Sequence, residues 1–106
     1  MSDPRIGGIA TFTGFVRGDP GVIAVEFDCS DAFIEDKLNE IAENLKKREG
    51  IVDVKIEHNR GRLNVGEQIA HFVVAGAHRE EILSTLADAI NRVKEQVHVS
   101  MREIRA

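Results

Sequence analysis

The sequence predicts an α+β fold with a mainly antiparallel sheet and two main helices. Two segments, at about 31–49 and 78–95, repeat apolar residues at the spacing of amphipathic helices. The remaining apolar runs have the length of strands and are separated by Gly, Pro, Asn and Asp. The order is two strands, a helix, three strands, a helix and a strand. From this order alone, we expect a ferredoxin-like sandwich.

The first two predicted strands are residues 8–16 and 22–28. Apolar side chains occupy both alternating sets of positions in 8–16, which is typical of a strand buried on both faces. The Gly-Asp-Pro-Gly segment at 18–21 predicts a turn that joins the two strands as a hairpin. Gly14 has no side chain, so another backbone or a ligand can come close to it.

The first helix is predicted to begin near Ser30 and to end at about Glu49, with Gly50 after it. Strands are predicted at 51–58, around 63–65 and at 68–76. The second helix turns Ile82, Leu83, Leu86, Ile90 and Val93 toward the core. The alternation of Val97, Val99 and Met101 predicts a final strand.

Length and composition limit the possible functions. The chain has 106 residues, which predicts a single domain spanning 1–106. A net charge of -4 argues against a general nucleic-acid or membrane-surface binder. Cys29 is the only cysteine, so no internal disulfide and no Cys/His metal motif is expected, and a reducing cytoplasm is the natural compartment.

Four cations are the candidate functional residues. Arg17 follows the first strand, where a guanidinium suits an anion. His78 and Arg79 open the second helix, whose free N–H groups also favour an anion. The alternative is that both are solvated, with Arg79 paired to a neighbouring glutamate. Lys94, near the far end of that helix, is either a lysine that complements the helix dipole or a reactive amine.

Three other residues are predicted to be structural. His58 ends a strand and His71 lies inside one, so both are expected to be hydrogen-bonded histidines. Cys29 has no activating partner nearby in the sequence and is expected to pack as a small apolar residue.

The chain also contains four blocks in a set order: GGIATFTGFVR at 7–17, HNRGRLNVGE at 58–67, AGAHRE at 75–80 and INRVK at 90–94. Together they resemble the large, catalytic subunit of molybdopterin synthase, the MoaE family. The resemblance implies an α/β-hammerhead fold in place of the ferredoxin-like sandwich.

The resemblance also implies an activity and its partners. The family inserts sulfur into a cyclic pyranopterin monophosphate, which forms the dithiolene of the molybdenum cofactor. The sulfur arrives as a thiocarboxylate on the C-terminal Gly-Gly of a small ubiquitin-like carrier, MoaD. The resemblance implies a homodimer within a heterotetramer, and it implies no cofactor.

By resemblance, Lys94 is the catalytic residue, and Arg17, His78 and Arg79 bind the substrate. The family's second active-site lysine is replaced by Met101, which has neither a proton to give nor a charge. Arg102 is adjacent, but neighbouring strand residues point to opposite faces, so it is not expected to take over. This departure leaves a second hypothesis open, that of a binding module without turnover. A small-molecule sensor is a third.

The spacing of these residues predicts a composite site. Arg79 and Lys94 lie on one helix, about 15 residues and ~22 Å apart. A single pterin cannot reach both ends, so we expect two subunits to contribute to one site.

Overall fold

The structure is a computed structural model, and it describes residues 3–106. Two helices, α1 (Asp31–Lys46) and α2 (Arg79–Gln96), are accompanied by one turn of 3₁₀-helix, η1 (His98–Ser100). The strands of this part of the chain are β1 (Gly8–Phe15), β2 (Val22–Phe27), β3 (Ile51–His58), β4 (Arg62–Asn64), β5 (Gln68–Gly76) and β6 (Met101–Arg105).

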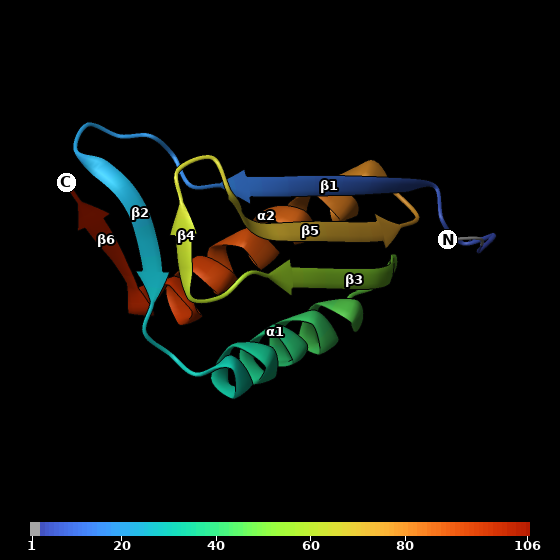
Figure 1. The fold of residues 1–106 in the computed structure, drawn as a ribbon. Helices are drawn as coiled ribbons and strands as arrows, with labels where there is room; N and C mark the ends of the chain where they lie inside the picture. Colours follow the sequence, from blue (N-terminus) through green and yellow to red (C-terminus); the bar gives the residue numbers. More distant parts are fainter. Residues whose placement is uncertain (1–2) are drawn as a thin grey trace.

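The strands form two small sheets rather than one. The first sheet has the order β1-β5-β3 and the second has the order β4-β2-β6, with every pair antiparallel. The first sheet lies along the helices and the second stands at their end (Figure 1). The predicted α+β class, with an antiparallel sheet and two main helices, is confirmed. The ferredoxin-like sandwich is wrong, because it requires a single sheet.

The predicted hairpin between the first two strands is also wrong. β1 pairs with β5, Gly8 opposite Gly76, whereas β2 pairs with β4 and β6. The reason lies in Val16, the residue after β1, which is 3% exposed. It packs in a second apolar cluster with Val25, Phe27 and Leu63, so the chain runs on into the second sheet instead of turning back.

The main core lies between the two helices and one face of the first sheet. Ile34 and Leu45 of α1 and Val74 of β5 are fully buried there. Because the helices cover only one face and β1 is an edge strand, the prediction that β1 is buried on both faces is wrong. Its large side chains stay substantially exposed: Ile9, Phe12 and Phe15. Leu83, predicted to face the core, is 52% exposed.

The ends of the helices follow local chemistry. Ser30 caps α1 by accepting a hydrogen bond from the Phe33 N–H at 3.1 Å. The helix ends at Lys46, earlier than predicted, and Gly50 turns the chain into β3 with a φ of 82°.

The final strand begins later than predicted. Val97 is fully buried, and its N–H donates to the carbonyl of Val93, which continues the helical turn. Residues 98–100 then form η1, and β6 starts at Met101.

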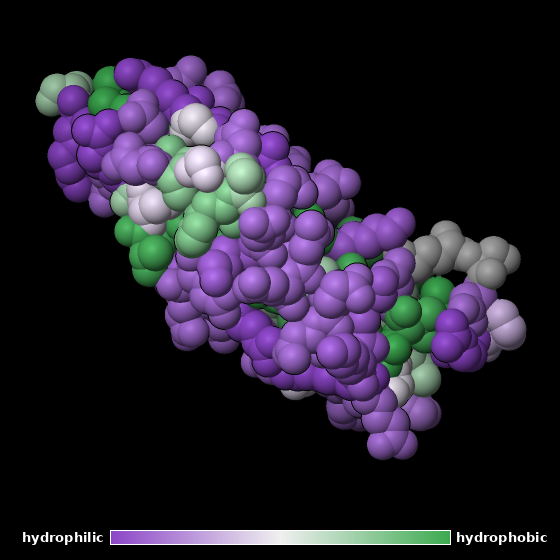
Figure 2. All heavy atoms as spheres, turned by 90° about the horizontal axis from the view of Figure 1, so that it is seen from below, coloured by the Kyte–Doolittle hydropathy of each residue, from purple (hydrophilic) through white to green (hydrophobic). Residues whose placement is uncertain are grey.

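The surface on the side of α1 is mostly hydrophilic, with hydrophobic atoms showing only in small separate patches (Figure 2). This agrees with the exposed acidic residues of α1, which include Glu35, Asp36 and Glu40. Within residues 3–106, neither helix has the length and apolar character needed to span a membrane.

Candidate functional site

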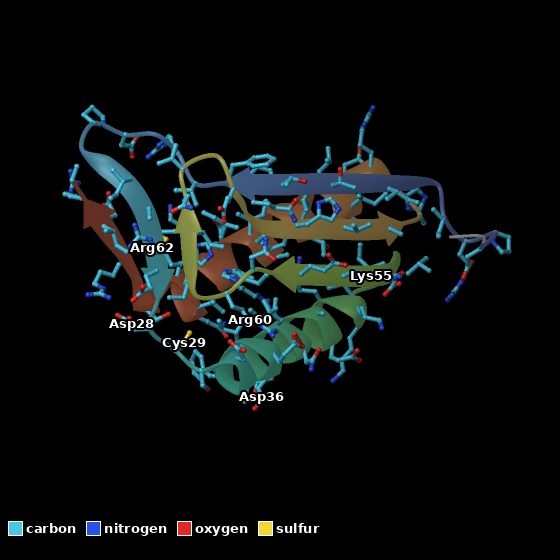
Figure 3. The ribbon with its side chains drawn as sticks, viewed as in Figure 1. Asp28, Cys29, Asp36, Lys55, Arg60 and Arg62 are labelled. Atoms are coloured by element: carbon cyan, nitrogen blue, oxygen red, sulfur yellow. The ribbon has the colours of Figure 1, made fainter. Side chains whose placement is uncertain are left out.

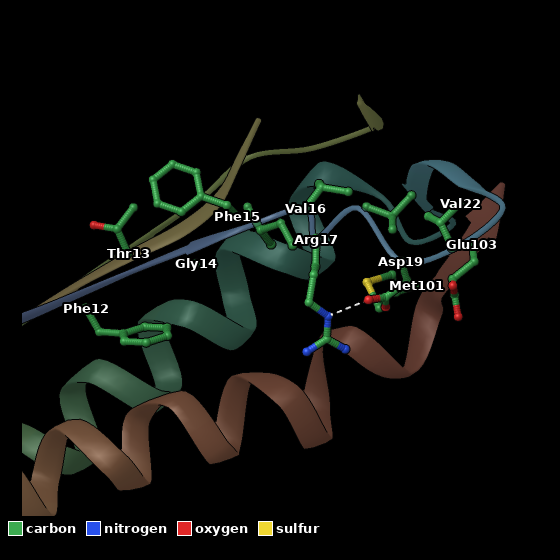
Figure 4. Close-up of a pocket in the computed structure, with 12 residues that line it drawn as sticks. Phe12, Thr13, Gly14, Phe15, Val16, Arg17, Asp19, Val22, Met101 and Glu103 are labelled. Atoms are coloured by element: carbon green, nitrogen blue, oxygen red, sulfur yellow. Dashed lines mark hydrogen bonds and ion pairs between the residues drawn. The ribbon is translucent and has the colours of Figure 1, made fainter. Parts of the chain in front are cut away.

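A pocket of about 390 Å³ lies where the two sheets meet. One wall comes from the end of β1 and the start of β5, the other from β2 and β6 (Figure 4). Most of its lining is apolar, and its charged side chains are Arg17, Asp19 and Glu103. Gly14 belongs to the lining and lies at a β-bulge, where the register of β1 on β5 shifts. A Cβ at Gly14 would contact the Phe12 ring at 3.6 Å, so the missing side chain leaves backbone exposed to the pocket beside that ring.

Arg17 is held at the rim of this pocket by its backbone neighbours. The Val16 N–H donates to the carbonyl of Glu67, and the Val16 carbonyl accepts from the Gly66 N–H, which fixes the chain just before Arg17. The guanidinium is 84% exposed, and its Nε donates to Asp19 Oδ1 at 2.9 Å (Figure 4). Its two Nη atoms make no hydrogen bond within residues 3–106, so they are free to bind an anion.

Met101 and Arg102 point to opposite sides of the second sheet. Met101 pairs with Phe27 and lines the pocket, as Glu103 does. Arg102 pairs with Glu26, and its Nη2 donates to the Glu26 carboxylate at 2.6 Å, away from the pocket. The expected alternation of the two side chains is therefore observed: Met101 faces the pocket and Arg102 does not.

His78 and Arg79 lie at the N-terminus of α2. His78 precedes the helix without a side-chain cap, and its Nδ1 lies 3.3 Å from Glu81 Oε2. Arg79 is exposed and has no ion pair within residues 3–106, so the predicted alternative of a pair with a neighbouring glutamate is not seen there. Neither residue lines the pocket.

Lys94 is exposed in the last turn of α2 and also lies outside the pocket lining. α2 is unbroken from Arg79 to Gln96, so Arg79 and Lys94 are ~22 Å apart along its axis. One chain thus brings Arg17 and Met101 to one pocket and does not bring His78 and Arg79 to Lys94.

The structure also shows a pair of histidines that the sequence did not predict. His58 Nε2 and His98 Nε2 are 3.0 Å apart, and both rings pack on Phe27, with centroid distances of 4.7 and 5.4 Å. Burial is the main cause that lowers the pKa of His98 to about 4, and the charges of His58 and Lys94 contribute to the same shift. Burial also lowers the pKa of His58, against its hydrogen bond to the Asn59 carbonyl. The alternation of residues 97–101 placed His98 in a strand, so it gave no signal of this contact.

The residues predicted to be structural are hydrogen-bonded. His58 contacts the Asn59 carbonyl, and His71 Nδ1 lies 2.7 Å from Thr13 Oγ1, as expected. Cys29, between β2 and α1, is only partly buried, and its Sγ lies 3.1 Å from Ser100 Oγ (Figure 3). No group of three His, Cys, Asp or Glu side chains suited to a metal occurs in residues 3–106.

The turn between β3 and β4 is tied to the first helix. Arg60 of this turn donates from Nη2 to the Glu35 carboxylate of α1, and the figure shows it between the two elements (Figure 3). This contact joins the turn that follows His58 to α1.

This chain is similar to a family of known proteins. The family model described as MoaE protein matches residues 1–96. The chain belongs to the MoaE family. A molybdopterin synthase catalytic subunit of Pyrococcus abyssi is 33% identical over 98% of this chain and 72% of its own length. The crystal structure of molybdopterin synthase from Staphylococcus aureus superposes with a TM-score of 0.82 at 25% identity, over 99% of this chain and 79% of that one.

A third relative is longer than this MoaE chain. The probable molybdopterin synthase of Haloferax volcanii is 36% identical over 92% of the chain. The matched region spans only 39% of that protein. The shared part is therefore the MoaE region, and the remainder of the Haloferax protein has no counterpart in the match.

Proposed function

We propose that this chain is the catalytic subunit of a molybdopterin synthase. It transfers sulfur from the thiocarboxylate of a small Gly-Gly-tailed carrier protein to a cyclic pyranopterin monophosphate, in the cytoplasm. The observation that carries the proposal is the pocket at the junction of the sheets, which the first family block lines in part and on whose rim Arg17 lies. Its mostly apolar interior suits an uncharged glycine tail, and Arg17 suits a carboxylate, thiocarboxylate or phosphate.

In this scheme each cation has one role. Arg17 holds the anionic end of the carrier or substrate at the pocket rim. As the carrier's sulfur bonds to a substrate carbon, an oxygen leaves that carbon, and Lys94 protonates the leaving oxygen or captures the carrier's acyl group. Water then cleaves the remaining bond to the acyl carbon, which leaves the sulfur on the substrate and releases the carrier as its carboxylate.

His78 and Arg79 of a second copy bind the pterin phosphate in the same scheme. The support for this is the length of α2, which separates them from Lys94 of their own chain. The test is to mix two inactive variants, Lys94→Ala and Arg79→Ala. Heterodimers are expected to regain part of the activity, because one of their two sites is intact. No recovery in a mixture shown to contain heterodimers would refute the composite site.

The activity itself is tested by dithiolene formation with a thiocarboxylated carrier and the pterin phosphate. Wild-type protein is expected to turn over, and Lys94→Ala to be inactive. The second candidate function, a binding module, is favoured by Met101, which puts a thioether in the pocket lining. If only Met101→Lys forms product, the chain is a binding module and the synthase proposal is wrong.

A further inference from the structure

A hydrogen-bonded pair of imidazoles lies beside the C-terminal end of α2 and has no role in the scheme above. His58 is the last residue of β3, and His98 is the first residue of η1. Their Nε2 atoms are 3.0 Å apart, and Phe27 of β2 packs against both rings. The pair therefore connects the first sheet to the segment that leads into β6.

The contacts of His58 determine where the hydrogens of the pair lie. His58 Nδ1 contacts the Asn59 carbonyl oxygen, which can only accept, so Nδ1 carries the hydrogen. A neutral imidazole has one N–H, so His58 Nε2 is an acceptor. His98 Nε2 must then be the donor, and His98 Nδ1 keeps a lone pair. Burial, which lowers the pKa of both rings, keeps them neutral near pH 7.

His98 Nδ1 is consequently an acceptor that the chain leaves unused. It has no hydrogen-bond partner within residues 3–106. In the same part of the chain, the one side-chain nitrogen or oxygen that is both fully buried and unpartnered is Arg60 Nε. His98 Nδ1 is therefore not fully buried, and a donor on the neighbouring surface can approach it.

Lys94 is the donor that the backbone places beside this acceptor. The helical conformation continues through Val97, whose N–H donates to the Val93 carbonyl at 2.8 Å. Lys94 and His98 are four residues apart on this backbone, a spacing that puts side chains next to each other. The positive charge of Lys94 acts on the His98 ring, since it contributes to the low pKa of His98. The other charge that acts on the pair is Arg60, through His58.

We infer that His98 Nδ1 is the hydrogen-bond acceptor that positions the Lys94 amine, with His58 holding the His98 ring in the required tautomer. The inference rests on the proposed function, in which Lys94 acts on the carrier's C-terminus. An exposed lysine has a long, flexible side chain, and a fixed neutral acceptor directs its Nζ without cancelling its charge. His98 is thus a positioning residue, and Lys94 remains the catalytic one.

Two amide substitutions separate this role from a structural one. Asparagine at 98 places its amide oxygen near the position of Nδ1, so His98→Asn keeps the acceptor for Lys94 and loses the bond to His58. Glutamine places its amide nitrogen near the position of Nε2, so His98→Gln keeps the bond to His58 and loses the acceptor. In the sulfur-transfer assay, we expect kcat of His98→Asn to stay within about threefold of wild type and kcat of His98→Gln to fall about tenfold. KM for the carrier is expected to stay unchanged in both.

The opposite order, with His98→Gln active and His98→Asn impaired, would show that the pair is structural only. Equal kcat values in the two folded variants would also overturn the inference. His58→Phe removes the acceptor that fixes the tautomer and is expected to lower kcat about tenfold. If His98→Asn does not fold, an unchanged kcat in folded His58→Phe decides against the inference. His71→Gln, which breaks only the contact with Thr13, is the matched control and should match wild type. An inactive wild type would reject the proposed function itself, whereas an active wild type with unaffected variants rejects only the positioning role.

Discussion

Acid is expected to destabilise the fold through His98, and His98→Gln is expected to remove much of that effect. In the folded chain the pKa of His98 is about 4, against an ordinary value of 6.5, because the ring is buried and lies beside His58 and Lys94. The unfolded chain therefore takes up this proton at a higher pH than the folded one. The stability that the neutral ring contributes is complete above pH 6.5 and is lost as the pH falls through the folded pKa.

The size of the effect follows from the two pKa values. Their difference corresponds to about 3 kcal/mol if the ring were fully shielded from water. His98 is only half-buried, and screening by solvent reduces this to about 1.5 kcal/mol. Roughly 1 kcal/mol of it should be lost by about pH 5. The pKa of His58 is lowered in the same direction, so its contribution has the same sign.

The measurement is urea unfolding at about pH 7.5 and about pH 5, since the window for the loss lies between the folded and unfolded pKa values. Far-UV circular dichroism is the suitable signal, because the chain has neither Trp nor Tyr. Between the two pH values, the wild-type free energy of unfolding should fall by about 1 kcal/mol more than that of His98→Gln. His71→Gln serves as the control and should follow wild type. Identical losses in wild type and His98→Gln would refute the claim that the His98 ring is desolvated.

Three further results are expected. Leu45→Ala should lower the free energy of unfolding by about 2–5 kcal/mol because Leu45 is fully buried, whereas Leu83→Ala should change it by less than about 0.5 kcal/mol; urea unfolding tests both. Gly50→Ala should lower the free energy of unfolding by about 1–3 kcal/mol, since φ is 82° and a Cβ there would meet the Glu81 carboxylate. Thermal unfolding of Gly50→Ala in the wild-type and Glu81→Ala backgrounds separates backbone strain from the clash. If Gly50→Ala changes stability in neither background, both causes are contradicted. Arg102→Met should leave kcat for sulfur transfer within about twofold, because Arg102 faces away from the pocket; a tenfold loss by the same assay would show that it reaches the site after all.

Much of the secondary structure could be predicted from the sequence because its signals are local. The 3.6-residue spacing of Ile34, Leu38, Ile41 and Leu45 predicts α1, and all four side chains are buried. The apolar run 68–76 coincides with β5. The prediction of which strands pair with each other was wrong, since the partner of a strand depends on residues far away in the sequence. The Gly-Asp-Pro-Gly segment allows a hairpin, but burial of Val16 against the second sheet costs less free energy than leaving it exposed.

The candidate site was predicted only in part, for a related reason. Local pattern and the family resemblance proposed Arg17, His78 and Arg79 as site residues, and α2 keeps Arg79 far from Lys94 of the same chain. The contact between His58 and His98 joins positions 40 residues apart, and neither residue carries a local signal for it. Such contacts follow from how the sheets are placed, and one-dimensional periodicity contains no information about that.

The pocket has its two walls on different sheets: Ile69 belongs to β5 of the first, and Val25 and Met101 belong to β2 and β6 of the second. The width of the pocket therefore depends on the angle between the two sheets, and not on the structure of either sheet alone. In the proposed function, a carrier tail bound between the two walls would fix the angle between the sheets of this elongated, 50 Å molecule. Binding of the carrier would then restrict the movement of one sheet relative to the other.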